Sequence, residues 1–116
     1  AFLDGDADLV ELLRQASVLH LPVIVLGEYQ FGLKASKLKK LREPQLRAFV
    51  KTCTVLPVME STIPFYATIR DGLRRAGTPI PENDIWICSL ALEYKLPVVS
   101  RDAHFRIVKQ VDSVGW

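Results

Sequence analysis

Short apolar runs alternate along the chain with stretches whose apolar residues recur at helical spacing. The first run, residues 18–23, is apolar apart from His20 and lacks the polar–apolar alternation of a half-exposed strand. It therefore indicates a strand that is buried on both faces of a parallel sheet. Further strands are expected at 54–58, 97–100 and 111–114.

Helices are expected between these strands, and capping residues indicate several of their ends. Asp8 and Glu11 have the spacing of a capping box, which opens a first helix. The basic stretch after residue 34, together with Pro44, should break the second helix, and Gly77 is well placed to end a long one. The predicted helices after the first cover about 24–34, 44–51, 62–76, 85–94 and 103–109.

Strands that alternate with helices predict an α/β fold, with a parallel sheet covered by helices on both faces. The chain has 116 residues, which is enough for a single domain spanning 1–116. It opens on the apolar triplet Ala1-Phe2-Leu3 with no strand before it. We therefore expect the first strand of the sheet to be missing from this chain and the domain to be N-terminally incomplete.

The composition is that of a globular protein: 49% of the residues are apolar and 24% are charged. Cys53 and Cys88 lie far apart among apolar neighbours, so we expect two buried, reduced thiols. There is no basic-then-apolar leader, and the longest apolar run, residues 21–27, is too short to cross a bilayer. These features favour a soluble, cytoplasmic protein.

Basic residues are clustered, although the net charge is only +2. The largest group lies in a stretch without acids and consists of Lys34, Lys37, Lys39, Lys40 and Arg42. Arg101 belongs to a smaller group near the C-terminus. Such clusters can neutralise phosphates of a nucleic acid, but a solvated helix face has the same pattern, and charge alone does not decide between them.

Glu28 stands out because its helix neighbours are apolar. Ile24 and Val25 lie one turn before it and Phe31 one turn after, which places Glu28 on an apolar stripe expected to face the core. A buried carboxylate is usually paired or bound to a metal. The alternative is an acid at the edge of the stripe that reaches solvent.

Asp84 and Asp102 are each expected at the start of a helix, Asp102 directly after the strand 97–100. Taken singly, each is as well explained as a helix cap. Together they indicate a site, because ligands of open α/β sheets gather beyond the carboxyl ends of the strands. Carboxylates without a His or Cys cluster suit Mg²⁺ or Mn²⁺, which can activate water for phosphodiester cleavage.

The two histidines are weaker candidates. His20 has no partner nearby in the sequence and is expected to be structural. His104, two residues after Asp102, is placed to touch phosphate, although a surface histidine at a helix start explains it as well.

Three segments in order resemble the VapC-type PIN-domain ribonucleases. The stretch 77–87, with its Pro-rich turn and Asn83-Asp84 pair before an apolar helix, resembles the most distinctive segment of that family. Residues 22–32 resemble its strand-to-helix turn with an acidic helix residue, and residues 98–105 resemble its late strand, which ends in an acid and a His-Phe pair.

The resemblance implies a Rossmann-like three-layer fold and a Mg²⁺- or Mn²⁺-dependent endoribonuclease, the toxin of a type II toxin–antitoxin system, which leaves a 3′-hydroxyl and a 5′-phosphate. Glu28, Asp84 and Asp102 match acidic positions of the metal site, and Ser100 matches a supporting Ser or Thr. It also implies an RNA substrate, a cognate antitoxin docked on the first helices, and a homodimer.

One departure from the family leaves alternatives open. The family's first acid, an Asp at the end of an opening strand, has no match here. The strand is upstream of this chain, or another chain supplies it, or the protein is degenerate. A non-catalytic PIN-like module that binds RNA or protein is therefore the main alternative. A small Rossmann-like phosphatase or response regulator would need an acid after its first strand and a late Lys, and neither is visible.

Overall fold

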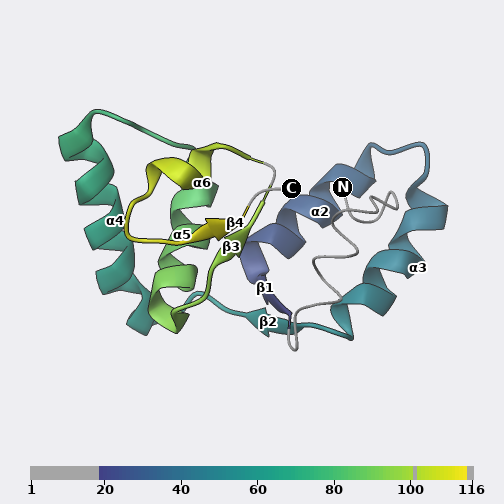
Figure 1. Ribbon diagram of the computed structural model, residues 1–116. Coiled ribbons are helices and arrows are strands. Elements are labelled where there is room, and N and C mark those ends of the chain that lie inside the picture. Colours follow the sequence, from purple (N-terminus) through teal and green to yellow (C-terminus); the bar gives the residue numbers. More distant parts are fainter. Residues whose placement is uncertain (1–18, 101, 115–116) are drawn as a thin grey trace. The chain divides into compact units, whose positions relative to one another are not determined.

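Residues 19–100 and 102–114 are described by the computed structural model (Figure 1). The helix expected from Asp8 lies outside the described residues, as does the side chain of Arg101. By its internal contacts the chain divides into two units, residues 1–57 and residues 58–116. Each unit is described by itself.

The first unit carries a pair of parallel strands and two helices. Strand β1 (His20–Pro22) leads directly into helix α2 (Val23–Lys34), and helix α3 (Lys39–Val50) leads to strand β2 (Thr54–Leu56). In the parallel pair, His20 lies opposite Thr54 and Pro22 opposite Leu56. Among residues 19–57, the buried apolar side chains are Leu21, Leu33, Leu46 and Leu56.

The prediction that Pro44 begins a helix is wrong. Helix α3 begins at Lys39, and Pro44 lies inside it. A proline in a helix removes one backbone hydrogen bond, but the turn before it is held by Arg42, whose backbone N–H donates to the carbonyl of Leu38 at 2.9 Å. After it, Leu46 is buried. Packing on the C-terminal side therefore outweighs the local preference of proline.

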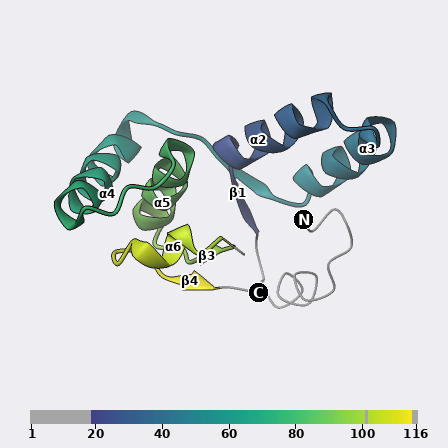
Figure 2. The ribbon, with the colours of Figure 1, turned by 90° about the horizontal axis from the view of Figure 1, so that it is seen from above.

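The second unit is built around helix α5 (Glu82–Tyr94), as Figures 1 and 2 show. A 3₁₀ turn (Glu60–Thr62) leads into helix α4 (Ile63–Ala76), which packs along α5. Strand β3 (Val98–Val99), helix α6 (His104–Ile107) and strand β4 (Ser113–Val114) complete the unit. Strands β3 and β4 are parallel, with Val98 opposite Ser113.

Helix α5 is buried on most of its surface, which explains its apolar sequence. Cys88, Ser89 and Leu90 are fully buried, and Ile69 from α4 packs in the same core. The Ser89 hydroxyl donates a hydrogen bond to the carbonyl of Ile85 at 2.6 Å, so this polar group is satisfied inside the core. Helix α5, which carries Asp84 in its first turn, is therefore anchored in the core of this unit.

Gly77 ends α4 as predicted. Its φ of 67° is in the left-handed region, which is the conformation that favours glycine at a helix end. The following helix begins earlier than predicted: Pro81 is the N-cap of α5 and Glu82 its first residue. Asp84 is therefore in the first turn of the helix rather than at its cap.

All strand pairs in the described residues are parallel, and helices connect them, so the predicted α/β class is confirmed. No helix among the described residues is long and apolar enough to span a membrane.

Candidate metal centre

Asp84 approaches the site from the first turn of α5. Only 15% of its side chain is exposed, and its backbone N–H donates to the carbonyl of Pro81 at 3.0 Å. The positive end of the helix dipole favours the ionised carboxylate at this position. A Pro-rich turn after helix α4 leads into α5, as predicted, so the rule that ligands gather beyond strand ends applies directly to Asp102 and not to Asp84.

Asp102 approaches from the segment between β3 and α6 and is fixed by two hydrogen bonds. Its backbone N–H donates to the Ser100 hydroxyl oxygen at 2.9 Å, and its Oδ1 accepts the backbone N–H of His104 at 2.9 Å. The second contact closes a short turn just before α6, whose N-cap is Ala103, so Asp102 is not the helix cap that the sequence left open. Asp102 therefore has a structural role at the start of α6, and Ser100 orients it.

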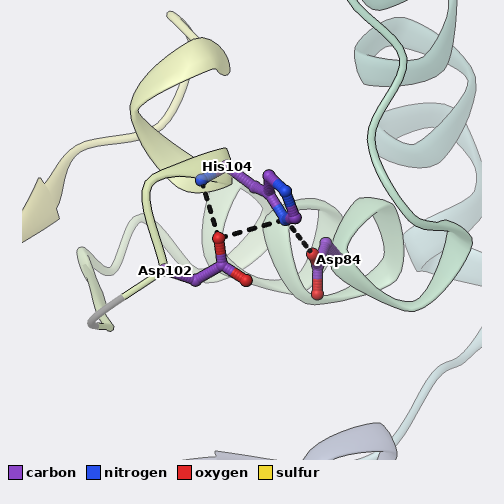
Figure 3. A group of neighbouring side chains, drawn as sticks. All are labelled: Asp84, Asp102 and His104. Carbon is purple, nitrogen blue, oxygen red and sulfur yellow. Dashed lines mark hydrogen bonds and ion pairs between the residues drawn. The ribbon is translucent and has the colours of Figure 1, made fainter.

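His104 joins the two carboxylates (Figure 3). Its Nδ1 lies 3.1 Å from Oδ2 of Asp84 and 3.0 Å from Oδ1 of Asp102. One donor atom from each of these three residues lies within 4.8 Å of the others. Asp84 and His104 are 20 positions apart in the sequence, and the packing of α6 on α5 brings them together. Two of the three predicted acids therefore converge with a histidine.

The donor set fits a divalent cation. Two carboxylates and one imidazole supply oxygen and nitrogen ligands from one side, and 43% of the His104 side chain is exposed, so solvent reaches the cluster. Carboxylates suit Mg²⁺ and Mn²⁺, and imidazole is a common ligand of transition metals. Asp84 and Asp102 are the carboxylates of this unit that would hold such an ion.

Glu28 lies on α2 of the first unit and is exposed. The stripe that we expected to face the core is not covered: Ile24 and Val25 are half-buried, and Phe31 is 81% exposed. Leu33 is the buried residue of α2. Glu28 belongs to the first unit, whereas Asp84 and Asp102 belong to the second, so the role of Glu28 in metal binding stays a prediction.

Comparison with known proteins decides the family. A sequence profile of the PIN domain matches residues 2–111. The chain belongs to the PIN-domain family. It is 29% identical over 94 residues to "Ribonuclease VapC5" of Mycobacterium tuberculosis, covering 79% of this chain and 70% of that protein. It is 27% identical over 108 residues to "Ribonuclease VapC2" of Rickettsia felis, covering 92% and 81%.

A solved structure shows the same fold. The crystal structure of VapBC2 from Rickettsia felis bound to a DNA fragment from its promoter matches this PIN domain with a TM-score of 0.83. The two are 25% identical, and the match covers 94% of this chain and 83% of the other. The resemblance to VapC-type PIN domains that the three sequence segments carry is thereby confirmed.

The basic residues predicted to contact RNA are only partly free. Lys34, Lys37 and Lys40 are exposed on the first unit of the PIN domain. Lys39 pairs with Glu43 one turn later at 3.8 Å, and both side chains are about two-fifths exposed. A surface pair of this kind is weak and leaves Lys39 able to exchange partners.

Cys88, the cysteine closest in sequence to Asp84, is buried and unreactive as a thiolate. Cys88 lies one turn after Asp84 on α5 and is fully buried. Burial, and to a smaller extent the negative charge of Asp84, raises the pKa of the Cys88 thiol to about 12. The thiol is therefore neutral at ordinary pH. Cys53 is free as well but half-buried, which corrects the expectation that both thiols are fully buried.

Proposed function

We propose that this PIN domain is a metal-dependent endoribonuclease of the VapC type, the toxin of a type II toxin–antitoxin system. The observation that carries the proposal is the convergence of Asp84 and Asp102, with His104 between them. The names of the two relatives, both ribonucleases, support the reaction type. The substrate would be cellular RNA, and the products would carry a 3′-hydroxyl and a 5′-phosphate.

Different side chains would bind the metal ion and position its ligands. Asp84 and Asp102, joined by Glu28, would hold Mg²⁺ or Mn²⁺ through carboxylate oxygens. A divalent ion bound there supplies an activated water and stabilises the leaving oxygen. Ser100 keeps Asp102 in position through its hydrogen bond to the Asp102 backbone. Partial burial of Asp84 strengthens its attraction for a cation, because water screens it less.

RNA would be held by its phosphates. Long lysine side chains neutralise phosphates and carry no base information, so they set affinity rather than sequence preference. The residues proposed for this role are Lys34, Lys37, Lys39, Lys40 and Arg101. Such contacts give binding that weakens steeply with salt.

We also propose a cognate antitoxin as partner, with a cytoplasmic homodimer as the free form. Several of the similar solved structures are VapBC structures. In this chain, apolar side chains on α2 and α3 are exposed, among them Phe31 at 81% and Leu41 at 60%. An apolar surface on these helices suits a segment of a partner protein.

The proposed function is tested by single-turnover cleavage of RNA with Asp84→Asn and Asp102→Asn. Each should lower the rate about a hundredfold or more, because ligand loss removes several kcal/mol of transition-state stabilisation. Asp112→Asn is the matched control, since Asp112 is exposed and lies outside the cluster. Cleavage by Asp84→Asn at the rate of the unmodified protein would contradict the proposal and favour a module that only binds RNA or protein.

A further inference from the structure

The position of His104 is not explained by hydrogen bonding to one partner. Its Nδ1 lies within 3.1 Å of carboxylate oxygens from two different segments, Asp84 on α5 and Asp102 before α6. A ring nitrogen has either one proton or one lone pair in the plane of the ring, so it cannot satisfy two anions equally as a donor. Three donors that face one another in this way suit a cation placed among them.

The separations also fit a metal. Adjacent ligands of an octahedral ion lie about 3 Å apart when each bond is about 2.1 Å long. Nδ1 of His104 is 3.1 Å from Asp84 and 3.0 Å from Asp102, so it has the spacing of a neighbouring ligand to each carboxylate. The three donor atoms lie within 4.8 Å of one another, close enough for a shift of the side chains to bring all of them onto one ion.

The backbone holds His104 in this place. Its own N–H donates to Oδ1 of Asp102, and Phe105, the next residue, is buried in the core of the second unit. The backbone of His104 is therefore fixed beside Asp102, while 43% of the His104 side chain stays open to solvent. An ion and its remaining water ligands can approach from that side.

We propose that Nδ1 of His104 is a direct ligand of the metal in this PIN domain, and that the site consequently prefers Mn²⁺ to Mg²⁺. Imidazole binds transition ions, whereas Mg²⁺ favours oxygen ligands, so one nitrogen in the set shifts selectivity toward Mn²⁺. The inference rests on the proposed function, because it assigns a ligand to the metal on which that function depends.

The direct test is pulsed EPR of Mn²⁺ bound to the protein, which detects nitrogen nuclei bonded to the ion. We expect a ¹⁴N coupling that becomes a ¹⁵N coupling when the protein is labelled with ¹⁵N-histidine. This measurement needs no substitution. The chain contains two histidines, so His20→Ala is the matched control and should keep the coupling, while His104→Gln should remove it.

Selectivity gives a second readout. We expect His104→Gln to lower the ratio of Mn²⁺ to Mg²⁺ affinity by about tenfold or more, measured by titration calorimetry, while Mg²⁺ still binds because the amide offers an oxygen. Thermal unfolding of the variant shows whether it is folded.

The outcomes separate the inference from the proposed function. Mn²⁺ that binds, is lost in Asp84→Asn and shows no histidine nitrogen coupling would overturn the role of His104 and leave the nuclease proposal standing. Absence of Mn²⁺ and Mg²⁺ binding in the unmodified protein would overturn both. An unchanged Mn²⁺ to Mg²⁺ ratio in a folded His104→Gln variant would also reject His104 as a ligand.

Discussion

The ring of Tyr66 on α4 stacks on the ring of Trp86 on α5, with centroids 3.9 Å apart and planes inclined by 18°. Trp86 lies two residues after Asp84, so the stack fixes the helix turn that carries this acid. The Tyr66 hydroxyl donates to Glu82 in the same turn, and Arg70 lies over the Tyr66 ring at 5.8 Å. The first turn of α5, which carries Asp84, is therefore anchored on α4.

Replacing Trp86 should weaken this anchor. We expect Trp86→Leu to lower the free energy of unfolding by about 1–2 kcal/mol, since the stacked pair and part of the buried ring area are lost. Tyr66→Phe keeps the ring and removes an exposed hydroxyl that donates to Glu82 and accepts from Arg70, so it should cost about 0.5–1.5 kcal/mol. Urea unfolding followed by circular dichroism measures both. A larger loss for Tyr66→Phe than for Trp86→Leu would show that the stack is not the main contact.

The predicted RNA surface gives a salt-dependence prediction. Changing Lys37, Lys39 and Lys40 to Ala should weaken RNA binding and reduce the slope of log K against log salt concentration by about 2, because three phosphate contacts are lost. The matched control removes the same charge from three exposed lysines elsewhere: Lys51, Lys95 and Lys109. Equal slopes for the two triple variants would show that Lys37, Lys39 and Lys40 form an ordinary solvated helix face and not an RNA-binding surface.

The two thiols should differ in reactivity. The pKa of Cys88 is raised to about 12 by burial, and burial also raises the pKa of the half-buried Cys53. Ellman's reagent at pH 8 should therefore modify Cys53 much faster than Cys88, which should react only after unfolding. Cys53→Ser identifies which thiol reacts. Rapid modification of a folded Cys53→Ser variant would contradict the buried position of Cys88.

The raised pKa of Cys88 makes the free energy of unfolding depend on pH. An unfolded cysteine ionises near its ordinary value of 9.0, while folded Cys88 keeps its proton up to about 12. The unfolded state thus loses protons first, and the stability that Cys88 contributes is fully present below pH 9 and is lost as pH rises toward 12. Unfolding free energies of the unmodified protein and of Cys88→Ala should converge over this window. A constant difference between them would contradict the raised pKa.

Glu28 is the untested member of the predicted metal set. Glu28→Gln should lower the RNA cleavage rate by tenfold or more and weaken Mn²⁺ binding, because the amide is a poorer ligand than the carboxylate. Glu60→Gln, at an exposed acid outside the Asp84–Asp102–His104 cluster, is the control and should change neither. Unaltered Mn²⁺ affinity in Glu28→Gln would remove Glu28 from the site.

Features with a local cause were predictable from the sequence. Gly77 ends α4 because a left-handed residue is needed there, and the apolar run after Asp84 forms a helix because it is buried on most sides. Pro44 was misjudged because the packing of Leu46 is a tertiary effect that no local rule includes.

The candidate metal centre was also predicted only in part from the sequence. Asp84 and Asp102 were found from their places at the starts of helices, and both lie in the cluster. The contact of His104 with Asp84 was not predicted, because Asp84 is 20 positions away and only the packing of α6 against α5 joins them. The signal present in the sequence was the two-residue spacing from Asp102 to His104, which is as common at ordinary helix starts.

The central claim, that this PIN domain cuts RNA through an ion held by Asp84 and Asp102, is tested most directly by metal depletion and return. RNA is incubated with the EDTA-treated protein, then with added Mn²⁺ or Mg²⁺, and the product ends are identified. We predict no cleavage after EDTA, recovery with either ion, and 5′-phosphate ends, with no recovery in Asp84→Asn. Cleavage that persists in EDTA, or that Asp84→Asn retains after the metal is returned, would contradict the account.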